Sequence, residues 1–222
     1  MKIDYNQMID HTYLKPEATH KEIDKLIDEA KKYNFKTICV NSSWVSYCKE
    51  KLTGTNIGIT SVVGFPLGAC TSETKAFEAQ EAIKLGANEI DMVIQIGKMK
   101  EGDYTYVLND IKTVKKACGN TTLKVIVETA LLTTEEVQKV TEIVMQSGAE
   151  FIKTSTGFST RGASLEDVKI MKLVCGDALL IKAAGGISNK QDMINMTKAG
   201  ANRFGTSRSV AIVEDKQATE GY

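Results

Sequence analysis

The sequence predicts a (β/α)8 barrel, and three observations lead to that fold class. Eight short β-type runs recur along the 222 residues, and their starts lie about 28 residues apart on average. Helix-like segments separate these runs, as parallel β/α units require. A Gly-Ala pair after a helical stretch also introduces a new apolar run three times, in LGANEIDMV (85–93), SGAEFIKTS (147–155) and AGANRFGTS (199–207). The alternative, an open doubly wound sheet, usually has GxGxxG after its first strand, where this sequence has none.

The predicted strands begin near residues 8, 36, 57, 89, 123, 150, 179 and 202, in the runs MIDHT, KTICV, IGITSVV, EIDMVI, LKVIVE, EFIKTS, LLIKA and NRFGT. Between them, a capping box from Thr19 to Glu22 predicts the start of a helix that continues through residue 30. Three further helical patterns each end in glycine, which readily adopts the left-handed conformation that closes a helix. They span residues 72–86, 133–148 and 164–176.

Composition and charge argue against several functions. The 28 basic residues balance 28 acidic ones, so no net charge attracts nucleic acid or an anionic membrane. The start, MKIDYNQMID, lacks an apolar signal core, and no apolar run approaches the ~18 residues of a spanning helix. The five cysteines are scattered and odd in number, which is typical of reduced thiols. We expect one cytoplasmic domain over residues 1–222, with a polar tail from about 214 and no cofactor.

Reactive residues recur at one position of the repeated pattern. In each copy, the residue five positions after the Gly or Asn that closes the helix is of this kind. These residues are Cys39, Asp91, Lys153 and Gly205. Because active sites in such barrels lie at the carboxyl ends of the strands, these positions predict one shared site. Lys182 follows Lys153 by one β/α step, so we expect the two lysines on neighbouring strands.

The two lysines predict chemistry on a carbonyl group. Burial and a second ammonium group nearby both lower the pKa of a lysine. A lysine that is neutral near pH 7 attacks carbonyl carbons, and Asp91 could carry protons directly or through water. A plain ion pair between Asp91 and Lys182, without a catalytic role, stays open as the structural alternative.

Glycine-rich turns after the same strands favour a phosphate site, with glycines that merely turn the chain as the structural alternative. Many barrels bind phosphate in the loops after strands 7 and 8, where glycine lets backbone N–H groups approach an anion. Arg208 could add positive charge. The candidate residues are Gly157, Gly185, Gly186, Gly205 and Ser207.

Several segments together resemble the deoxyribose-phosphate aldolases, class I enzymes of the bacterial type. The similar segments are EIDMVI, KVIVET, FIKTSTGFS, IKAAGGI and RFGTS. The resemblance runs in order from IDHTYLKP (9–16) to GTSRSVAIV (205–213) and so covers nearly the whole chain. KTSTGF followed one unit later by KAAGG is a specific combination, whereas each segment alone is weak.

The resemblance implies a barrel that reversibly cleaves 2-deoxy-D-ribose 5-phosphate to D-glyceraldehyde 3-phosphate and acetaldehyde, in deoxyribose phosphate catabolism. It implies that Lys153 forms the Schiff base, that Lys182 perturbs it and takes part in proton transfer, and that Asp91 relays protons. The glycines and Ser207 named above match the positions that hold the phosphate. The implied partners are a small phosphosugar and aldehydes, and a homodimer stays open.

Other residues carry open alternatives. Arg161 and Arg208 stand where relatives tend to have small residues, and each is expected either to touch phosphate or to lie at the rim. Cys39 is either a pocket thiol that reacts with aldehydes or a buried inert one. Tyr222 either belongs to a disordered end, as is common for termini, or folds over the mouth of the barrel.

Supporting roles are predicted for two pairs of residues. Asp10 and Thr12 are candidates to line the pocket from the first strand. Lys124 and Glu128 share a strand face and could form a supporting charge network.

Three other functions remain to be weighed. A metal-dependent aldolase is disfavoured, because His11 and His20 are the only histidines and there is no HExxH motif. A transaldolase-like enzyme would use the same Schiff-base chemistry but transfer a three-carbon ketone instead of releasing acetaldehyde. A non-catalytic barrel that binds phosphosugars would form no covalent adduct.

Overall fold

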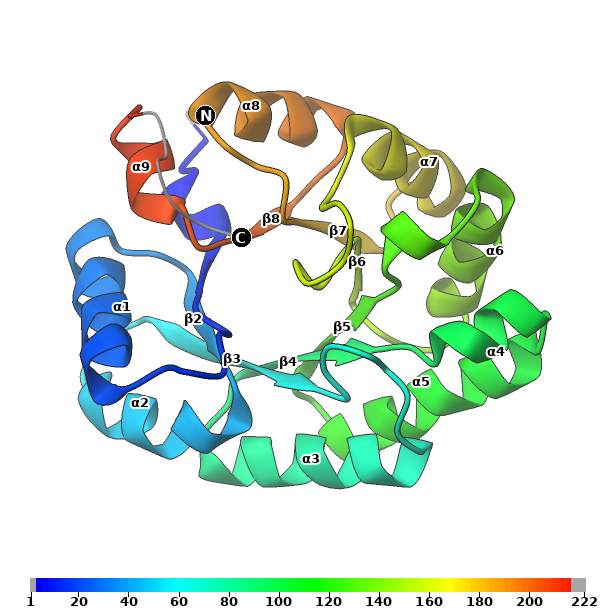
Figure 1. Ribbon diagram of the computed structural model, residues 1–222, viewed down its shortest axis with the longest axis horizontal. Coiled ribbons are helices and arrows are strands. Elements are labelled where there is room, and N and C mark those ends of the chain that lie inside the picture. Colours follow the sequence, from blue (N-terminus) through cyan, green and yellow to red (C-terminus); the bar gives the residue numbers. More distant parts are fainter. Residues whose placement is uncertain (1–2, 217–222) are drawn as a thin grey trace.

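The computed structural model describes residues 3–216, in which eight parallel strands close into a barrel (Figure 1). The strands are β1 (Ile9–Thr12), β2 (Thr37–Val40), β3 (Gly58–Val63), β4 (Glu89–Val93), β5 (Thr122–Ile126), β6 (Phe151–Lys153), β7 (Leu180–Ala184) and β8 (Arg203–Thr206). Each strand pairs with the next, and β8 pairs with β1. All eight begin within one residue of the predicted positions. The predicted (β/α)8 barrel is therefore confirmed.

Helices form an outer ring around the strands (Figure 1). Within residues 3–216 they are α1 (His20–Tyr33), α2 (Val45–Lys51), α3 (Ser72–Leu85), α4 (Ile96–Glu101), α5 (Tyr104–Cys118), α6 (Thr134–Met145), α7 (Leu165–Cys175), α8 (Lys190–Ala199) and α9 (Ser209–Val213). Three short 3-10 turns accompany them, η1 (Asn6–Met8), η2 (Ser42–Trp44) and η3 (Thr129–Leu131). The four helices predicted individually correspond to α1, α3, α6 and α7.

Local signals explain where the helices begin and end. The predicted capping box forms at the start of α1, and Asn34 closes this helix in the left-handed conformation with φ 52°. The predicted end of α6 at Gly148 is wrong, because the helix already stops at Met145. Ser147 lies in this turn and donates its hydroxyl to the carbonyl of Val144 at 2.7 Å. Such a side-chain bond competes with continued helix.

The apolar core and the charged groups lie on opposite sides of the strands. The apolar core fills the layer between strands and helices, with Ile23, Ile90 and Ile181 among its fully buried members. Successive strand residues face opposite sides, so Asp91 and Lys182 point into the barrel, and both are fully buried. The barrel interior is thus a charged compartment enclosed by an apolar layer.

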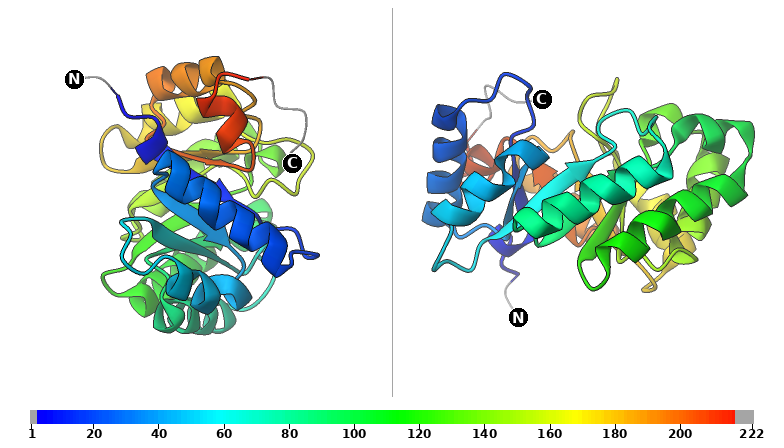
Figure 2. Two further views of the ribbon diagram at one scale, coloured as in Figure 1. Left: turned by 90° about the vertical axis from the view of Figure 1, so that its left-hand side faces the viewer. Right: turned by 90° about the horizontal axis from the view of Figure 1, so that it is seen from below.

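The loops that leave the carboxyl ends of the strands gather at one end of the barrel. The yellow loop after β6 and the cyan loop after β3 rise together at that end, opposite the blue η1 (Figure 2). Among residues 3–216, no helix is both long and apolar enough to cross a membrane. Tyr222 lies outside the described residues, so neither prediction for it is tested.

Candidate active site

Strand register brings the two predicted lysines together. Lys153 ends β6 and pairs in register with Lys182 of β7. Asp91 of β4 reaches both side chains with one oxygen. Its Oδ2 accepts hydrogen bonds from Lys153 Nζ at 2.7 Å and from Lys182 Nζ at 2.8 Å. The three residues predicted to be catalytic therefore meet around a single carboxylate oxygen.

Asp91 is an ionised carboxylate surrounded by ammonium groups. Its second oxygen, Oδ1, accepts a hydrogen bond from Lys124 Nζ at 2.7 Å. Complete burial by itself would raise the pKa of Asp91, but Lys124, Lys153 and Lys182 together hold that pKa well below its usual value. Asp91 therefore stays ionised, and its hydrogen bonds to Lys153 and Lys182 give a path along which a proton can pass between the two amines.

The two predicted lysines differ in their partners and hence in their pKa. Burial lowers the pKa of Lys182, but Asp10 and Asp91 outweigh it and raise the pKa above the ordinary value. For Lys153, burial prevails and lowers the pKa, with Asp91 opposing the shift and Lys182 adding to it. Among residues 3–216, Asp91 is the one carboxylate within ion-pair distance of Lys153. The lowering that burial and a second ammonium group predict thus prevails for Lys153, whereas the carboxylates of Asp10 and Asp91 reverse it for Lys182.

A second layer of charge lies deeper in the barrel. Lys124 Nζ lies 2.7 Å from Glu89 Oε2. Arg203 Nη1 lies 2.9 Å from the same Glu89 oxygen and 2.6 Å from Asp10 Oδ1. Sequence reasoning missed Glu89 and Arg203. The signal was present in the alternation of strand residues, because each stands two positions before a predicted site residue and so shares its strand face.

A small pocket opens next to Lys153 at the carboxyl ends of the strands. Four of the five residues predicted to hold phosphate line it, and Gly186 does not. Ser207 Oγ is buried and has no hydrogen-bond partner within residues 3–216. Because buried polar atoms are normally hydrogen-bonded, this hydroxyl marks a place for a polar ligand group. The lining residues are Thr12, Leu14, Lys153, Thr156, Gly157, Ala184, Gly185, Gly205, Thr206 and Ser207.

Glycines permit two close approaches around the pocket. Gly185 and Gly186 have φ values of 68° and 71°, and a Cβ on Gly186 would lie 2.8 Å from the carbonyl oxygen of Ala163. Gly186 therefore packs against the loop after β6. A Cβ on Gly205 would lie 3.0 Å from Cε of Lys182. Gly205 thus leaves the space that the Lys182 side chain fills, which the phosphate prediction did not include.

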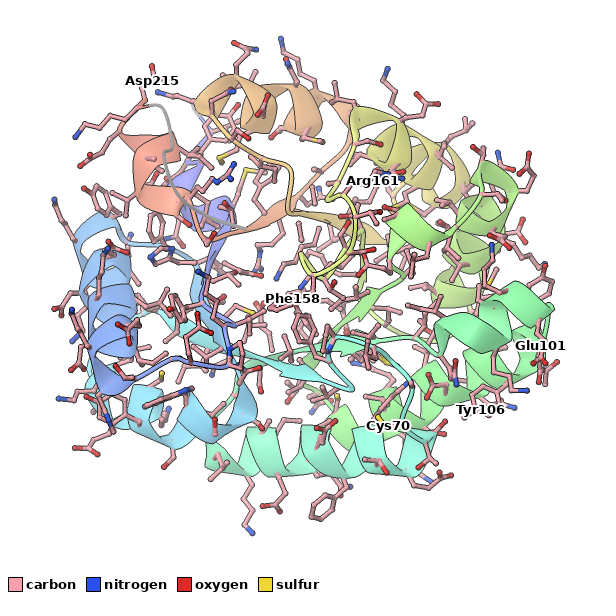
Figure 3. The ribbon with its side chains drawn as sticks, in the orientation of Figure 1. Cys70, Glu101, Tyr106, Phe158, Arg161 and Asp215 are labelled. Atoms are coloured by element: carbon pink, nitrogen blue, oxygen red, sulfur yellow. The ribbon has the colours of Figure 1, made fainter. Side chains whose placement is uncertain are left out.

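The two arginines at this end of the barrel contact protein groups. Arg161 lies near α7 (Figure 3), and its guanidinium forms a fork with Asp167, at 2.5 Å from Oδ2 and 3.1 Å from Oδ1. It also donates to the carbonyl oxygen of Thr129 at 3.2 Å. These contacts favour a rim position for Arg161. Arg208 donates from Nη1 to Ser188 Oγ at 3.1 Å.

Glu128 supports the loop after β6. Its Oε2 accepts hydrogen bonds from the backbone N–H of Thr156 at 3.2 Å and from the Thr156 hydroxyl. The same hydroxyl accepts the N–H of Phe158 at 3.0 Å. Phe158 lies near the centre of the barrel end (Figure 3) and meets Phe65 edge to face, with ring centroids 5.3 Å apart. The structure therefore places Lys124 in the charge network and Glu128 with this loop.

The remaining predicted residues divide between the pocket and the interior. Thr12 lines the pocket, whereas Asp10 is fully buried within the charge network. Cys39 lies in a small apolar cluster with Leu14 and Val62. Burial raises the pKa of the Cys39 thiol, and a thiol without thiolate character is a poor nucleophile. This favours the inert alternative for Cys39.

The arrangement suits chemistry on a small carbonyl compound that carries an anionic group. Lys153 is an amine with a lowered pKa, and it lies at the pocket wall. Such an amine adds to carbonyl carbons, and the adjacent carboxylate of Asp91 can move protons. The glycine turns and the Ser207 hydroxyl offer donors for an anion.

Comparison with known proteins gives consistent matches. Residues 5–209 match the family model described as DeoC/LacD family aldolase. A deoxyribose-phosphate aldolase of Mycoplasmopsis pulmonis is 59% identical over 220 residues, which cover 99% of this chain and 100% of that protein. The corresponding protein of Staphylococcus carnosus is 51% identical, with the same coverage.

Solved structures are also similar. A protein of Coccidioides immitis, provisionally identified as a deoxyribose-phosphate aldolase, superposes with a TM-score of 0.93 at 42% identity. The match covers 95% of this chain and 84% of that one. A tetrameric deoxyribose phosphate aldolase of Aeropyrum pernix has a TM-score of 0.83 at 31% identity, over 94% of this chain and 89% of that one.

Proposed function

Since the chain belongs to the DeoC/LacD family of aldolases, we propose that it reversibly cleaves 2-deoxy-D-ribose 5-phosphate to D-glyceraldehyde 3-phosphate and acetaldehyde, in the breakdown of deoxyribose phosphates. The observation that carries the proposal is the contact of Lys153 and Lys182 with the same oxygen of Asp91, beside a pocket that contains an unpartnered buried hydroxyl among residues 3–216. Relatives whose matches cover 99% of this chain are named deoxyribose-phosphate aldolase.

Lys153 is the proposed nucleophile. Its neutral amine adds to the aldehyde carbon C1 of the open-chain sugar, and the carbinolamine loses water to give an iminium ion. Removal of the C3 hydroxyl proton then breaks the C2–C3 bond, because the iminium accepts the electron pair as an enamine. C3 to C5 leave as glyceraldehyde 3-phosphate. Protonation of the enamine at C2 and hydrolysis of the resulting iminium release acetaldehyde and restore the amine.

Lys182 and Asp91 are the proposed partners in proton transfer. The ammonium of Lys182 disfavours a second positive charge on Lys153 and so helps to lower the pKa of the nucleophile. Asp91 Oδ2 lies within hydrogen-bond reach of both amines, so a proton can pass between them through this oxygen. Asp91, Lys182 and a water molecule are the candidates for removing the C3 hydroxyl proton.

The phosphate is proposed to lie in the turns after β6, β7 and β8. Gly157, Gly185, Gly205 and Ser207 line the pocket there. Backbone N–H groups of these turns and the Ser207 hydroxyl, which has no partner among residues 3–216, supply the donors, as in many barrels of this kind. The N–H of Gly185 itself already donates to the carbonyl of Gly205 at 3.2 Å. Gly186 acts through packing on Ala163, which holds the turn in place.

The cellular setting and the assembly are part of the proposal. All five cysteines are free thiols, which suits the cytoplasm. We propose a homodimer as the assembly. The similar aldolase of Aeropyrum pernix is tetrameric, so light scattering of the purified protein decides between these states.

Separate assays of the two products test the proposed reaction. With 2-deoxy-D-ribose 5-phosphate, the protein should release acetaldehyde and glyceraldehyde 3-phosphate in equal amounts. Lys153→Met should abolish both, whereas the matched change Lys169→Met, at an exposed position of α7, should leave both unchanged. Transfer of a three-carbon ketone would indicate a transaldolase-like enzyme. Tight binding of the sugar phosphate without either product would indicate a binding barrel.

A further inference from the structure

Six charged side chains form a closed ring inside the barrel, with acids and bases in strict alternation. Lys124 lies 2.7 Å from Asp91 and 2.7 Å from Glu89. Arg203 continues the ring, 2.9 Å from Glu89 and 2.6 Å from Asp10. Asp10 pairs with Lys182, which lies 2.8 Å from Asp91 and so closes the ring. In order, the members are Asp91, Lys124, Glu89, Arg203, Asp10 and Lys182.

The ring balances its own charge and leaves Lys153 outside it. Three carboxylates alternate with three cations, so the ring is neutral when all six groups are ionised. Lys153 joins only through Asp91 Oδ2, at 2.7 Å. A proton on Lys153 would therefore add a positive charge that no further carboxylate of the ring balances. Such a charge is costly in a buried site.

We propose that Glu89 and Arg203, on the side of the ring away from the pocket, are positioning residues that keep Lys153 neutral by completing this balanced ring. The proposal rests on the proposed role of Lys153 as the nucleophile. Neither residue lines the pocket next to Lys153. Glu89 instead borders a separate hollow at the amino ends of the strands, together with Thr37, Gly58 and Thr122. Their influence on Lys153 is electrostatic and passes through Lys124, Asp91, Asp10 and Lys182.

The groups that face Lys153 come from several strands. Asp91 of β4 and Lys182 of β7 contact or neighbour it directly, and Lys124 of β5 shares Asp91 with it. Cys39 of β2 and Glu128 after β5 lie close enough to interact with its charge. The Cys39 thiol is protonated at neutral pH because burial raises its pKa. The variants below leave all five of these groups in place.

Opposite changes in the net charge of the ring should shift the pKa of Lys153 in opposite directions. Glu89→Gln keeps the size of the side chain and gives the ring a net positive charge, which should lower the pKa of Lys153 further. Arg203→Met gives the ring a net negative charge, which should raise it. The double variant restores a neutral ring and should return the pKa to its starting value. Each single shift should be on the order of one pH unit.

The readout is the rate of borohydride trapping with deoxyribose 5-phosphate as a function of pH, with the adduct mapped by mass spectrometry. The rate falls on the acid side as Lys153 takes up its proton. This fall in rate, the acid limb of the pH profile, should move to lower pH in Glu89→Gln and to higher pH in Arg203→Met. In the double variant it should lie at the same pH as in the unaltered protein. Arg203→Lys keeps the charge and should leave the limb in place. Glu101→Gln, in an exposed ion pair with Lys98, is the matched control.

The outcomes separate this inference from the proposed function. Thermal unfolding first establishes that each variant is folded. If Arg203→Met does not fold, the shift of the acid limb in Glu89→Gln alone tests the proposal. An adduct on Lys153 with the same acid limb in every folded variant would overturn the ring proposal and leave the aldolase chemistry standing. Shifts of the acid limb in the same direction in both single variants would also overturn it. A purely structural role would not depend on whether the lost charge is negative or positive. No adduct in the unaltered protein would instead reject the proposed function.

Discussion

Lys153 and Lys182 stand side by side on adjacent strands and hold the same oxygen of Asp91, yet burial and neighbouring charge shift their pKa values in opposite directions. The difference arises from Asp10, which pairs with Lys182 alone of the two. Lys182 is therefore held as a positive charge, whereas the lowered pKa of Lys153 favours the neutral amine more than in a free lysine. This division of roles underlies the predictions below.

Replacing Lys182 should change the pH dependence of the reaction. Lys182→Met removes the ammonium that lowers the pKa of Lys153, so that pKa should rise and a smaller fraction of Lys153 should be neutral at pH 7. We expect kcat/KM at pH 7 to fall by about 10- to 100-fold, with part of the loss recovered at higher pH. A pH profile of kcat/KM checks this. Lys172→Met, at an exposed ion pair on α7, is the control. An unchanged acid limb would refute the electrostatic role.

Adding one methyl group at Gly205 should disturb Lys182. The new Cβ would lie 3.0 Å from Lys182 Cε, and this side chain is held in place by Asp10 and Asp91. We expect Gly205→Ala to lower kcat by about 10-fold or more, since small displacements in a preorganised site are costly. Steady-state kinetics measure the effect. Gly97→Ala, where the nearest atom is the side-chain oxygen of the partly buried Gln95 at 3.2 Å, is the control. Full activity of Gly205→Ala would show that the space is not needed.

The Ser207 hydroxyl should matter for substrates that carry phosphate. It is buried in the pocket without a partner among residues 3–216, so a phosphate oxygen is its expected acceptor. Ser207→Ala should raise KM for deoxyribose 5-phosphate by about 10-fold, the loss expected for one hydrogen bond to a charged group. KM for unphosphorylated deoxyribose should stay within about twofold. Ser43→Ala, at an exposed position of η2, is the control. Equal effects on both sugars would argue against a phosphate contact.

Arg161 should contribute to stability more than to substrate affinity. Its guanidinium is already engaged by Asp167 and by the carbonyl oxygen of Thr129. Arg161→Ala should lower the free energy of unfolding by about 1–2 kcal/mol, measured by urea denaturation. KM for deoxyribose 5-phosphate should change less than about threefold. A large rise in KM, confined to the phosphorylated sugar, would instead show that Arg161 binds phosphate.

The sequence alone could predict the barrel and the meeting of Asp91, Lys153 and Lys182, because both follow from spacing. Strands at a regular step close into a barrel, and a fixed count from the helix ends places Asp91 and Lys153 at one end of it. Lys182 follows Lys153 by one β/α step and so joins them. The pKa of Lys182 could not be predicted in the same way, because it depends on Asp10, which lies 172 positions away in the chain.

The charged ring likewise depends on contacts that periodicity does not encode. Alternation shows that Glu89 and Arg203 face the barrel interior, but their contact joins β4 to β8 across the barrel and links residues 114 positions apart. The end of α6 was missed for a local reason, the bond from Ser147 to the helix carbonyl. Sequence spacing thus does not predict which side chains meet across the barrel. Nor does it predict where a side chain competes with the backbone and ends a helix.

The most direct test of the central claim is borohydride trapping with deoxyribose 5-phosphate, followed by peptide mass mapping. If Lys153 is the nucleophile, the reduced protein carries a two-carbon adduct on Lys153 and is inactivated in proportion to it. The same adduct on Lys182 would contradict the division of roles between the two lysines. A folded protein that binds the sugar phosphate but forms no adduct on either lysine would contradict the Schiff-base mechanism altogether.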